Sequence, residues 1–544
     1  MKPNVCVRVR SATGSLFRGP VGQGIILRAV IFTLLCGVGI GTLQMTAQSA
    51  VPFRLKEKPG SFGVGLKVVE QYDYSRVFQP LVDALGQPFQ GERARPLQTL
   101  VWYPAQASSA KPMIFSDYIA LKATETSFGR PKKLIGMEER HISGMRPSYT
   151  TAMWAVRDAP LAPGRFPVII YAPSFSSVSW ENADLCEYLA SFGYVVIAAP
   201  GMGVGRESTH DVAGTNAQAQ DISFLIGYAQ TLADTDSSKV AVIGFSWGGL
   251  ANLFAASRDN RINALVALDG SLRYFPGVVK QAGDVHPEQM TIPLLFFKGQ
   301  HSLEDEDRLE QAFNSAGPSV LNEWVHGDLI SVQMLGLIHP EFSSTVQRNE
   351  LLWRDEFPHL QESDYGREDE SIGYAWVARY TREFLDAYLK GSSSSSTFLK
   401  NTPMENGVPL HVMAVEYHPA QSMPASFTSF RTEVGHKGFD HASEIYEALR
   451  KEQPSFVLEP DAVTSWAYEL LAEGHLSEAL DIIKFAVQLN PSSHNYASLG
   501  EMYADASQHQ SAIDSYRKAL EKNPNDLAAK QGLERLESPA SLQH

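Results

Sequence analysis

The sequence predicts an α/β protein: a doubly wound, mostly parallel β-sheet, followed by an all-α C-terminal region of helical repeats. From residue 166 onward, short apolar segments alternate with amphipathic segments. This rhythm is typical of a parallel sheet that is covered by helices on both faces. After residue 460 the sequence repeats itself with a period of 33 residues, a length found in helical repeat proteins. The 544 residues are enough for two or more domains.

The composition is that of a globular chain with a large apolar core. Hydrophobic residues make up 44% of the sequence and charged residues 19%, which argues against an intrinsically disordered protein. The formal net charge is −14, from 46 basic and 60 acidic side chains. Such a surface repels phosphate backbones, so the sequence predicts no nucleic-acid binding.

The first 50 residues differ from the rest of the chain. They contain five basic residues, no acidic residue, and the apolar run AVIFTLLCGVGIGTL, Ala29 to Leu43. Ala47 and Ser49 follow as small residues that suit a signal peptidase. We therefore expect residues 1–50 to be a cleaved export signal and the protein to be periplasmic or extracellular. The alternative is an uncleaved membrane anchor, for which this apolar run is short. Cleavage would leave Cys186 as the one cysteine, without an internal disulfide.

The chain is expected to divide into a core domain over residues 51–391, a linker over residues 392–459, and repeats over residues 460–538. Within the core, residues 166–174, 193–201, 239–246, 262–270 and 291–299 are apolar segments of strand type. Segments of helical type lie between them, and a longer one ends at Gly391. Residues 111–160 lack clear periodicity and are either a cap over the site or a surface excursion. The linker opens with GSSSSS, which is typical of a flexible segment, and contains a short helix.

The C-terminal region contains two copies of a 33-residue unit. The matched positions are Ala467 and Gly500, Ala479 and Ala512, Ala486 and Ala519, and Pro491 and Pro524. Small residues where two helices cross, aromatic residues and a closing proline resemble tetratricopeptide repeats. A final polar-faced helix would cover the end of the stack. Such repeats would bind a protein partner, whereas the simpler interpretation is a plain helical hairpin.

Ser246 lies in Gly244-Phe245-Ser246-Trp247-Gly248, which fits the pattern G-x-S-x-G. The pentapeptide follows the apolar strand KVAVI and precedes the helical segment LANLFAA. In this context the serine sits on a sharp strand-to-helix elbow, in a strained backbone conformation that needs glycines on both sides. The elbow exposes the hydroxyl at a helix N-terminus, so the sequence predicts Ser246 as a nucleophile.

A serine nucleophile needs a base and an orienting acid, in the chain order serine, acid, histidine. For the acid we favour Asp269, which ends an apolar strand and precedes a glycine, because sites in open α/β sheets gather at strand ends. The alternative is Asp305, one strand later in a charged cluster. For the base we favour His339, just past the apolar run ISVQMLGLI, over its rival His326.

The oxyanion of the reaction needs two backbone N–H donors. We expect one from Trp247, directly after the nucleophile, and one from Phe175, in the loop after YAPS. The two side chains also bring apolar bulk that suits an acyl group. The histidines are scattered and no H-E-x-x-H or glycine-rich phosphate motif follows a strand, so we expect neither a metal nor an organic cofactor.

Five stretches resemble the α/β-hydrolase superfamily, most of all the platelet-activating-factor acetylhydrolase and dienelactone-hydrolase-like group. They are DYSR with LQTLVWYPA, YLASFGYVVIAAPG, GFSWGG, ALVALDG followed by IPLLFF, and GLIHPEFSS. The resemblance spans residues 61–391 and supports Asp269, His339 and Phe175 in the roles given above. It implies a calcium-independent serine esterase with short or oxidised acyl chains on phospholipids as characteristic substrates. The family commonly has His-Gly in the oxyanion loop, where this chain has Pro173 and Ser174.

The leading hypothesis is therefore a serine carboxylic-ester hydrolase that acts through an acyl-enzyme on short-chain or lipid esters. One alternative is an interaction protein, in which the hydrolase core is inactive or weak and the repeats bind a partner. A second alternative is a hydrolase of dienelactone-type, polyester or peptide substrates, because the sequence contains no specificity pocket that distinguishes them.

Overall fold

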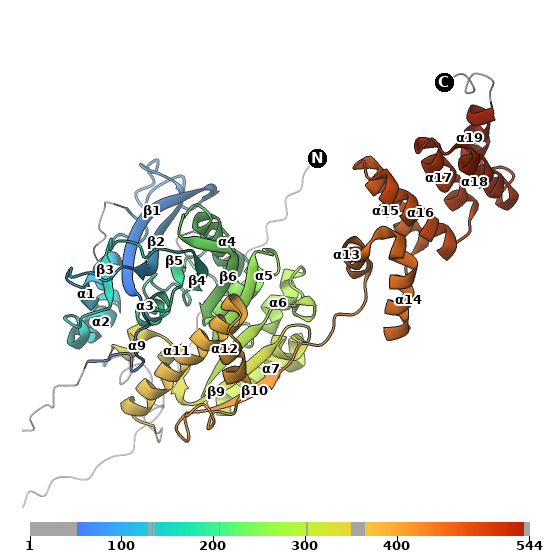
Figure 1. Cartoon of the computed structure of the whole chain (residues 1–544). Helices are drawn as coiled ribbons and strands as arrows, with labels where there is room; N and C mark the ends of the chain where they lie inside the picture. Colours follow the sequence, from blue (N-terminus) through green and yellow to red (C-terminus); the bar gives the residue numbers. More distant parts are fainter. Residues whose placement is uncertain are drawn as a thin grey trace, which may run out of the picture. The chain divides into compact units, whose positions relative to one another are not determined.

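The computed structural model describes residues 52–128, 133, 137–205, 207–300, 303–349 and 365–537. The expected export signal, residues 1–50, lies outside these ranges. Described strands fall between residues 63 and 418, and the elements from residue 427 to residue 537 are helical (Figure 1). No helix in the described part of the chain is both long enough and apolar enough to cross a membrane.

Ten strands of the described residues form one mixed sheet, in the order β10-β9-β8-β7-β6-β4-β5-β2-β1-β3. The strands are β1 (Gly63–Val77), β2 (Ala94–Ala105), β3 (Ala155–Arg157), β4 (Phe166–Ala172), β5 (Val195–Ala198), β6 (Thr235–Phe245), β7 (Ile262–Leu268), β8 (Leu294–Gln300), β9 (Leu329–Ile338) and β10 (Met413–His418). Neighbours from β9 to β5 pair in parallel. Antiparallel pairs join β5 to β2, β2 to β1, and β9 to β10. The predicted doubly wound, mostly parallel sheet is confirmed.

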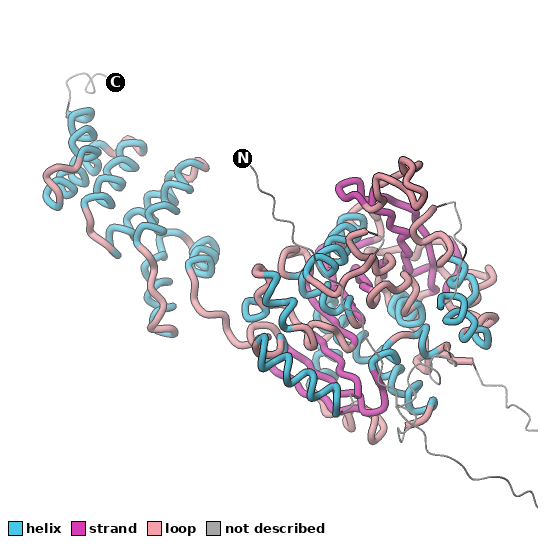
Figure 2. Tube along the Cα trace, turned by 180° about the vertical axis from the view of Figure 1, so that it is seen from behind, coloured by secondary structure: helices cyan, strands magenta, loops and turns pink. Residues whose placement is uncertain are grey.

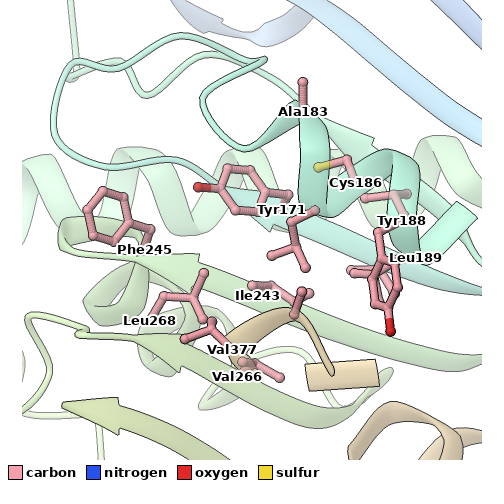
Figure 3. Packing of buried hydrophobic residues seen from close by; sticks show 14 of the residues in the cluster. Tyr171, Ala183, Cys186, Tyr188, Leu189, Ile243, Phe245, Val266, Leu268 and Val377 are labelled. Atoms are coloured by element: carbon pink, nitrogen blue, oxygen red, sulfur yellow. The ribbon is translucent and has the colours of Figure 1, made fainter. Parts of the chain in front are cut away.

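Helices cover both faces of the sheet (Figure 2). Alternate side chains of β4 belong to two hydrophobic cores, one on each face of the sheet. Ile169 and Tyr171 are buried in the first core, and Val168 and Ile170 are buried in the second. α3 (Ala183–Ser191) and α11 (Arg367–Lys390) supply the first core, which Figure 3 shows. α4 (Val212–Ala229) and α5 (Trp247–Ala256) supply the second. The other helices of this part are α1 (Phe115–Leu121), α2 (Met137–Gly144), α6 (Pro276–Ala282), α7 (Leu303–Ala316), α8 (Val320–Glu323), α9 (Ser344–Gln347) and α12 (Ser393–Lys400). Burial on both faces explains the continuous apolar runs of the parallel strands.

Residues 111–160 form α1, α2 and β3 where described. Phe115 and Tyr118 of α1 are buried in the core against α3, and β3 pairs in parallel with β1. Cys186, on α3, is a buried free thiol in this core. This segment is therefore anchored to the sheet and to α3 by side chains that the lack of periodicity did not reveal.

The sheet domain extends beyond residue 391, the boundary expected from the sequence. Gly391 ends α11 in the left-handed conformation, with φ of 67°, as a C-terminal glycine does. The serines that follow were expected to be flexible, but Ser392 caps α12 by accepting a hydrogen bond from the N–H of Ser395. Leu399 of α12 is buried in the core of the sheet domain. β10 then adds an edge strand to β9, so residues 392–418 complete the sheet domain.

The helical region contains seven helices within the described residues. They are α13 (Phe427–Lys437), α14 (Ala442–Glu452), α15 (Pro460–Ala472), α16 (Leu476–Leu489), α17 (Ser493–Asp505), α18 (His509–Lys522) and α19 (Leu527–Glu537). Alternate helices begin at residues 427, 460, 493 and 527. The period of 33 thus extends one helix pair towards the N-terminus, into the stretch expected as linker. Phe430 and Tyr446 of this added pair pack with Trp466 in one core, which gives the two sequence-derived units a third neighbour.

Candidate active site

Ser246 stands at the corner between β6 and α5. Its backbone has φ of 53° and ψ of −119°, a region that non-glycine residues rarely adopt. A Cβ on Gly244 would lie 2.2 Å from the carbonyl oxygen of Gly248, and a Cβ on Gly248 would lie 2.1 Å from that of Ala172. Both approaches are too close for any side chain. The two glycines therefore permit the tight elbow and bring the start of α5 against the end of β4.

The structure brings Ser246, His339 and Asp269 together at the carboxyl ends of β6, β7 and β9. Nε2 of His339 lies 2.8 Å from Oγ of Ser246. Nδ1 of His339 lies 2.6 Å from Oδ2 of Asp269. Because an ionised carboxylate only accepts hydrogen bonds, Nδ1 carries the hydrogen and Nε2 presents a lone pair to the serine hydroxyl. The imidazole is thus oriented as an acceptor for the proton of Ser246.

Asp269 is fully buried and held by hydrogen bonds other than the one from His339. Its Oδ1 accepts from the hydroxyl of Tyr274 at 2.5 Å and from the N–H of Gly299 at 3.1 Å. Burial raises the pKa of Tyr274, and the charge of Asp269 raises it further, so this hydroxyl stays protonated and donates. The side chain of His339, by contrast, is 41% exposed. The acid is enclosed while the base can be reached by a substrate.

The two alternative residues are not part of this arrangement as described. Nδ1 of His326 lies 3.1 Å from the carbonyl oxygen of Gln421, at an exposed position. Asp305 lies in α7, and its side chain is outside the described part of the structure. Tyr274 and Gly299 were missed by the sequence reasoning, because no motif links them to Asp269.

The loop after β4 carries Phe175, the expected second donor. No acceptor for the backbone N–H of Phe175 is found within the described ranges. Trp247 is the first residue of α5, where a backbone N–H has no partner inside the helix. The hydroxyl of Ser174 donates to the carboxylate of Glu181 at 2.5 Å, so its hydrogen is already engaged. Among the described residues, the backbone N–H groups of Phe175 and Trp247 therefore have no acceptor and flank the elbow.

Aromatic rings line one side of the elbow. The ring of His210 stacks on Phe175, with centroids 3.7 Å apart and planes 14° apart. Trp247 meets Phe175, His210 and Phe275 edge to face, with centroids 6.1, 4.9 and 5.2 Å away. Sequence reasoning identified Phe175 and Trp247 but missed His210 and Phe275. Trp247 is buried beneath the other three rings, and the exposed His210 and Phe275 can contact the organic part of a substrate.

The described residues contain no group of three or more histidine, cysteine or acidic side chains that could hold a metal ion. The candidate catalytic group at the elbow is the hydrogen-bonded set of Ser246, His339 and Asp269. Such a cluster can activate a hydroxyl for attack on a carbonyl carbon.

Residues 153–321 match the model of the Dienelactone hydrolase family, a span that contains Ser246 and Asp269. The chain is 33% identical over 113 residues to a Synechocystis sp. protein named "Putative carboxymethylenebutenolidase"; the match covers 18% of this chain and 46% of that protein. A Yersinia pestis protein of the same name is 27% identical over 121 residues, covering 20% and 45%. The chain thus spans less than half the length of these curated relatives. A solved ferulic acid esterase from Streptomyces cinnamoneus shares 18% identity at a TM-score of 0.43, over 62% of this chain and 93% of that one. The family match bears on the dienelactone-hydrolase part of the resemblance drawn from the sequence.

Proposed function

We propose that the protein is a serine carboxylic-ester hydrolase that acts through an acyl-enzyme. The observation that carries this proposal is the continuous line of hydrogen bonds from Oγ of Ser246 through the imidazole of His339 to Asp269. The match of residues 153–321 to the Dienelactone hydrolase family supports it, as do the names of the two curated relatives, each "Putative carboxymethylenebutenolidase".

The proposed reaction has two halves. Oγ of Ser246 attacks the ester carbonyl carbon while Nε2 of His339 takes its proton, and Asp269 stabilises the imidazolium that forms. The backbone N–H groups of Phe175 and Trp247 stabilise the oxyanion. His339 then protonates the departing alcohol, which leaves Ser246 acylated. Water attacks the acyl carbon while the same imidazole takes its proton. The bond between the acyl carbon and Oγ then breaks, His339 returns the proton to Oγ, and the acid leaves with the hydroxyl of Ser246 restored.

For the substrate we propose short-chain or lipid esters, of which a platelet-activating-factor analogue is the lipid to test. The exposed imidazole and the apolar rings beside the elbow support an ester with an apolar part. The helical region of residues 427–537 is proposed as a place for a protein partner, on the strength of its repeated helix pairs.

The test compares the purified wild type with Ser246→Ala. The wild type should hydrolyse p-nitrophenyl acetate and be labelled at Ser246 by a fluorophosphonate probe. The variant should lose at least about 10⁴-fold in kcat and all labelling, with an unchanged circular dichroism spectrum. Undiminished turnover by the variant would reject the mechanism. A folded wild type that neither turns over esters nor becomes labelled would favour the interaction protein instead. Acetyl, butyryl and long-chain esters, beside the lipid analogue, then define the acyl preference.

A further inference from the structure

Glu181 is a buried carboxylate that fastens the loop carrying Phe175. It lies just before α3 and is 4% exposed. Its carboxylate accepts from the backbone N–H of Ser174 at 2.8 Å, from the hydroxyl of Ser174 at 2.5 Å, and from the hydroxyl of Tyr171 at 3.1 Å. Burial raises the pKa of Glu181, whereas the bonds from Ser174 lower it. One side chain thus holds the residue that directly precedes the candidate oxyanion donor.

The backbone of Glu181 holds a second loop, the one that follows His339. Its carbonyl oxygen accepts from the hydroxyls of Ser343 and Ser344 at 3.1 and 3.2 Å, and from the N–H of Thr345 at 3.1 Å. These donors lie four to six residues after His339. Glu181 therefore contacts both loops: its side chain bonds to the loop of Phe175, and its backbone carbonyl bonds to the loop that follows His339.

Asn182 makes further hydrogen bonds to the loop that follows His339. Its amide oxygen accepts from the N–H of Ser344 and from the hydroxyl of Tyr374, each at 2.7 Å. Its amide nitrogen donates to the carbonyl oxygen of Phe342 at 2.9 Å and to the hydroxyl of Tyr171 at 2.7 Å. All four hydrogen bonds that an asparagine amide can make are satisfied at a buried position. The turn after His339 is therefore fixed to the same dipeptide as the loop of Phe175.

The loop of Phe175 needs an anchor of this kind. Pro173 has no N–H to donate, and Ser176 has φ of 55°, a conformation that persists only when its surroundings enforce it. The loop also lies directly against the elbow, because a Cβ on Gly248 would be 2.7 Å from the carbonyl oxygen of Pro173. A small movement of Ser174 would therefore change the distance between the Phe175 N–H and the serine.

We propose that Glu181, with Asn182, is a positioning residue that fixes the oxyanion donor of Phe175 relative to the imidazole of His339. This proposal rests on the proposed ester hydrolysis. In this role the buried carboxylate of Glu181 anchors the Pro173-Ser174 segment and does not itself touch the reacting atoms. Glutamine at position 181 would offer one acceptor oxygen and would present its NH₂ group to donors, so one of the two bonds from Ser174 would be lost or replaced by a weaker one.

The test is Glu181→Gln, with Glu187→Gln as the matched control. Glu187 is also buried, lies on α3, and accepts one hydroxyl and one backbone N–H, from Tyr118 and Trp154. Glu181→Gln should lower kcat for p-nitrophenyl acetate about 10- to 100-fold and leave KM within about threefold. Glu187→Gln should retain kcat. Hydrogen–deuterium exchange gives a readout without turnover: Glu181→Gln should speed exchange over residues 173–177, which the Glu181 carboxylate holds. Asn182→Ala, which removes the side-chain bonds to Phe342 and Ser344, should speed exchange over residues 339–345.

Each outcome decides the matter. Wild-type kcat in Glu181→Gln, or an equal fall in kcat in Glu187→Gln, would overturn the positioning role. So would unchanged exchange over residues 173–177 in Glu181→Gln, or over residues 339–345 in Asn182→Ala. If Glu181→Gln does not fold, Ser174→Ala removes the hydroxyl bond alone and should still lower kcat several-fold at constant KM; wild-type kcat there would also overturn it. An inactive wild type would refute the proposed hydrolysis, while the exchange data would still test the link between the two loops.

Discussion

Glu187 should make the stability of the sheet domain depend on pH. This carboxyl is 2% exposed and accepts from the hydroxyl of Tyr118 at 2.6 Å and from the N–H of Trp154 at 2.7 Å. Burial raises its pKa from 4.5 to about 7, and the nearby charge of Asp184 adds to the rise. In the folded protein the group therefore keeps its proton at pH values where the unfolded chain has lost it.

The sign of the effect follows from this difference in proton binding. Between about pH 4.5 and pH 7 the folded state binds more protons than the unfolded state, so the free energy of unfolding falls as the pH rises. Below this window Glu187 is protonated in both states, so its ionisation does not change the free energy of unfolding. Above it the folded state holds a buried charge. At about 1.4 kcal/mol for each pH unit, the loss amounts to about 3 kcal/mol.

Urea-induced unfolding of the wild type and of Glu187→Gln at pH 4.5 and at pH 8 measures this loss. The variant has no proton to lose, so the difference in free energy of unfolding, variant minus wild type, should be about 3 kcal/mol larger at pH 8 than at pH 4.5. Any fixed cost of the amide is present at both pH values and cancels. The same difference at both pH values would refute the assignment of a raised pKa to Glu187.

Two further substitutions test the candidate site and its support. Asp269→Asn replaces the acceptor 2.6 Å from Nδ1 of His339, so the imidazole loses its orienting charge and can adopt the wrong tautomer. The kcat should fall about 10³- to 10⁴-fold, and labelling by a fluorophosphonate should slow in parallel. Normal labelling would contradict the role assigned to Asp269. Gly248→Ala places a Cβ 2.1 Å from the carbonyl oxygen of Ala172, which forces β4 and α5 apart. The free energy of unfolding should drop by about 3 kcal/mol or more. A variant with wild-type stability and turnover would show that the elbow does not need this glycine.

The elbow could be predicted because everything that makes it is local. An apolar strand, the glycines at 244 and 248, and an apolar helix are contiguous in the sequence and contiguous in space. Asp269 and His339 were accessible for a different reason. The carboxyl ends of parallel strands meet at one edge of a sheet, so a polar residue directly after a buried strand is a candidate to join a site there. Both follow such strands, β7 and β9.

The partners of these residues could not be predicted, because they depend on contacts across long separations. Glu181 meets Ser343 across 162 residues, and Gly299 meets Asp269 across 30 residues. The strand β10 is similar. Its six residues carry no signal beyond alternation, and they become a strand because β9 offers an edge about 80 positions earlier. The serine run before it forms a helix because Leu399 is buried in the core, a fact that serine-rich composition conceals.

The backbone itself indicates how the candidate site is maintained. Three non-glycine residues with positive φ lie at the site: Ser176 at 55°, Ser246 at 53° and Asp269 at 42°. Each such conformation costs on the order of 1–3 kcal/mol and persists only where neighbouring structure enforces it. The N–H of Ser246 donates to the carbonyl of Leu268 at 3.1 Å, and its carbonyl accepts from the N–H of Ser271 at 2.7 Å. The strained elbow is thus bonded on both sides to the chain around the strained Asp269. The nucleophile and the acid are therefore held as one unit by the end of β7, and the imidazole that links their side chains adds a second connection between residues whose main chains are already joined.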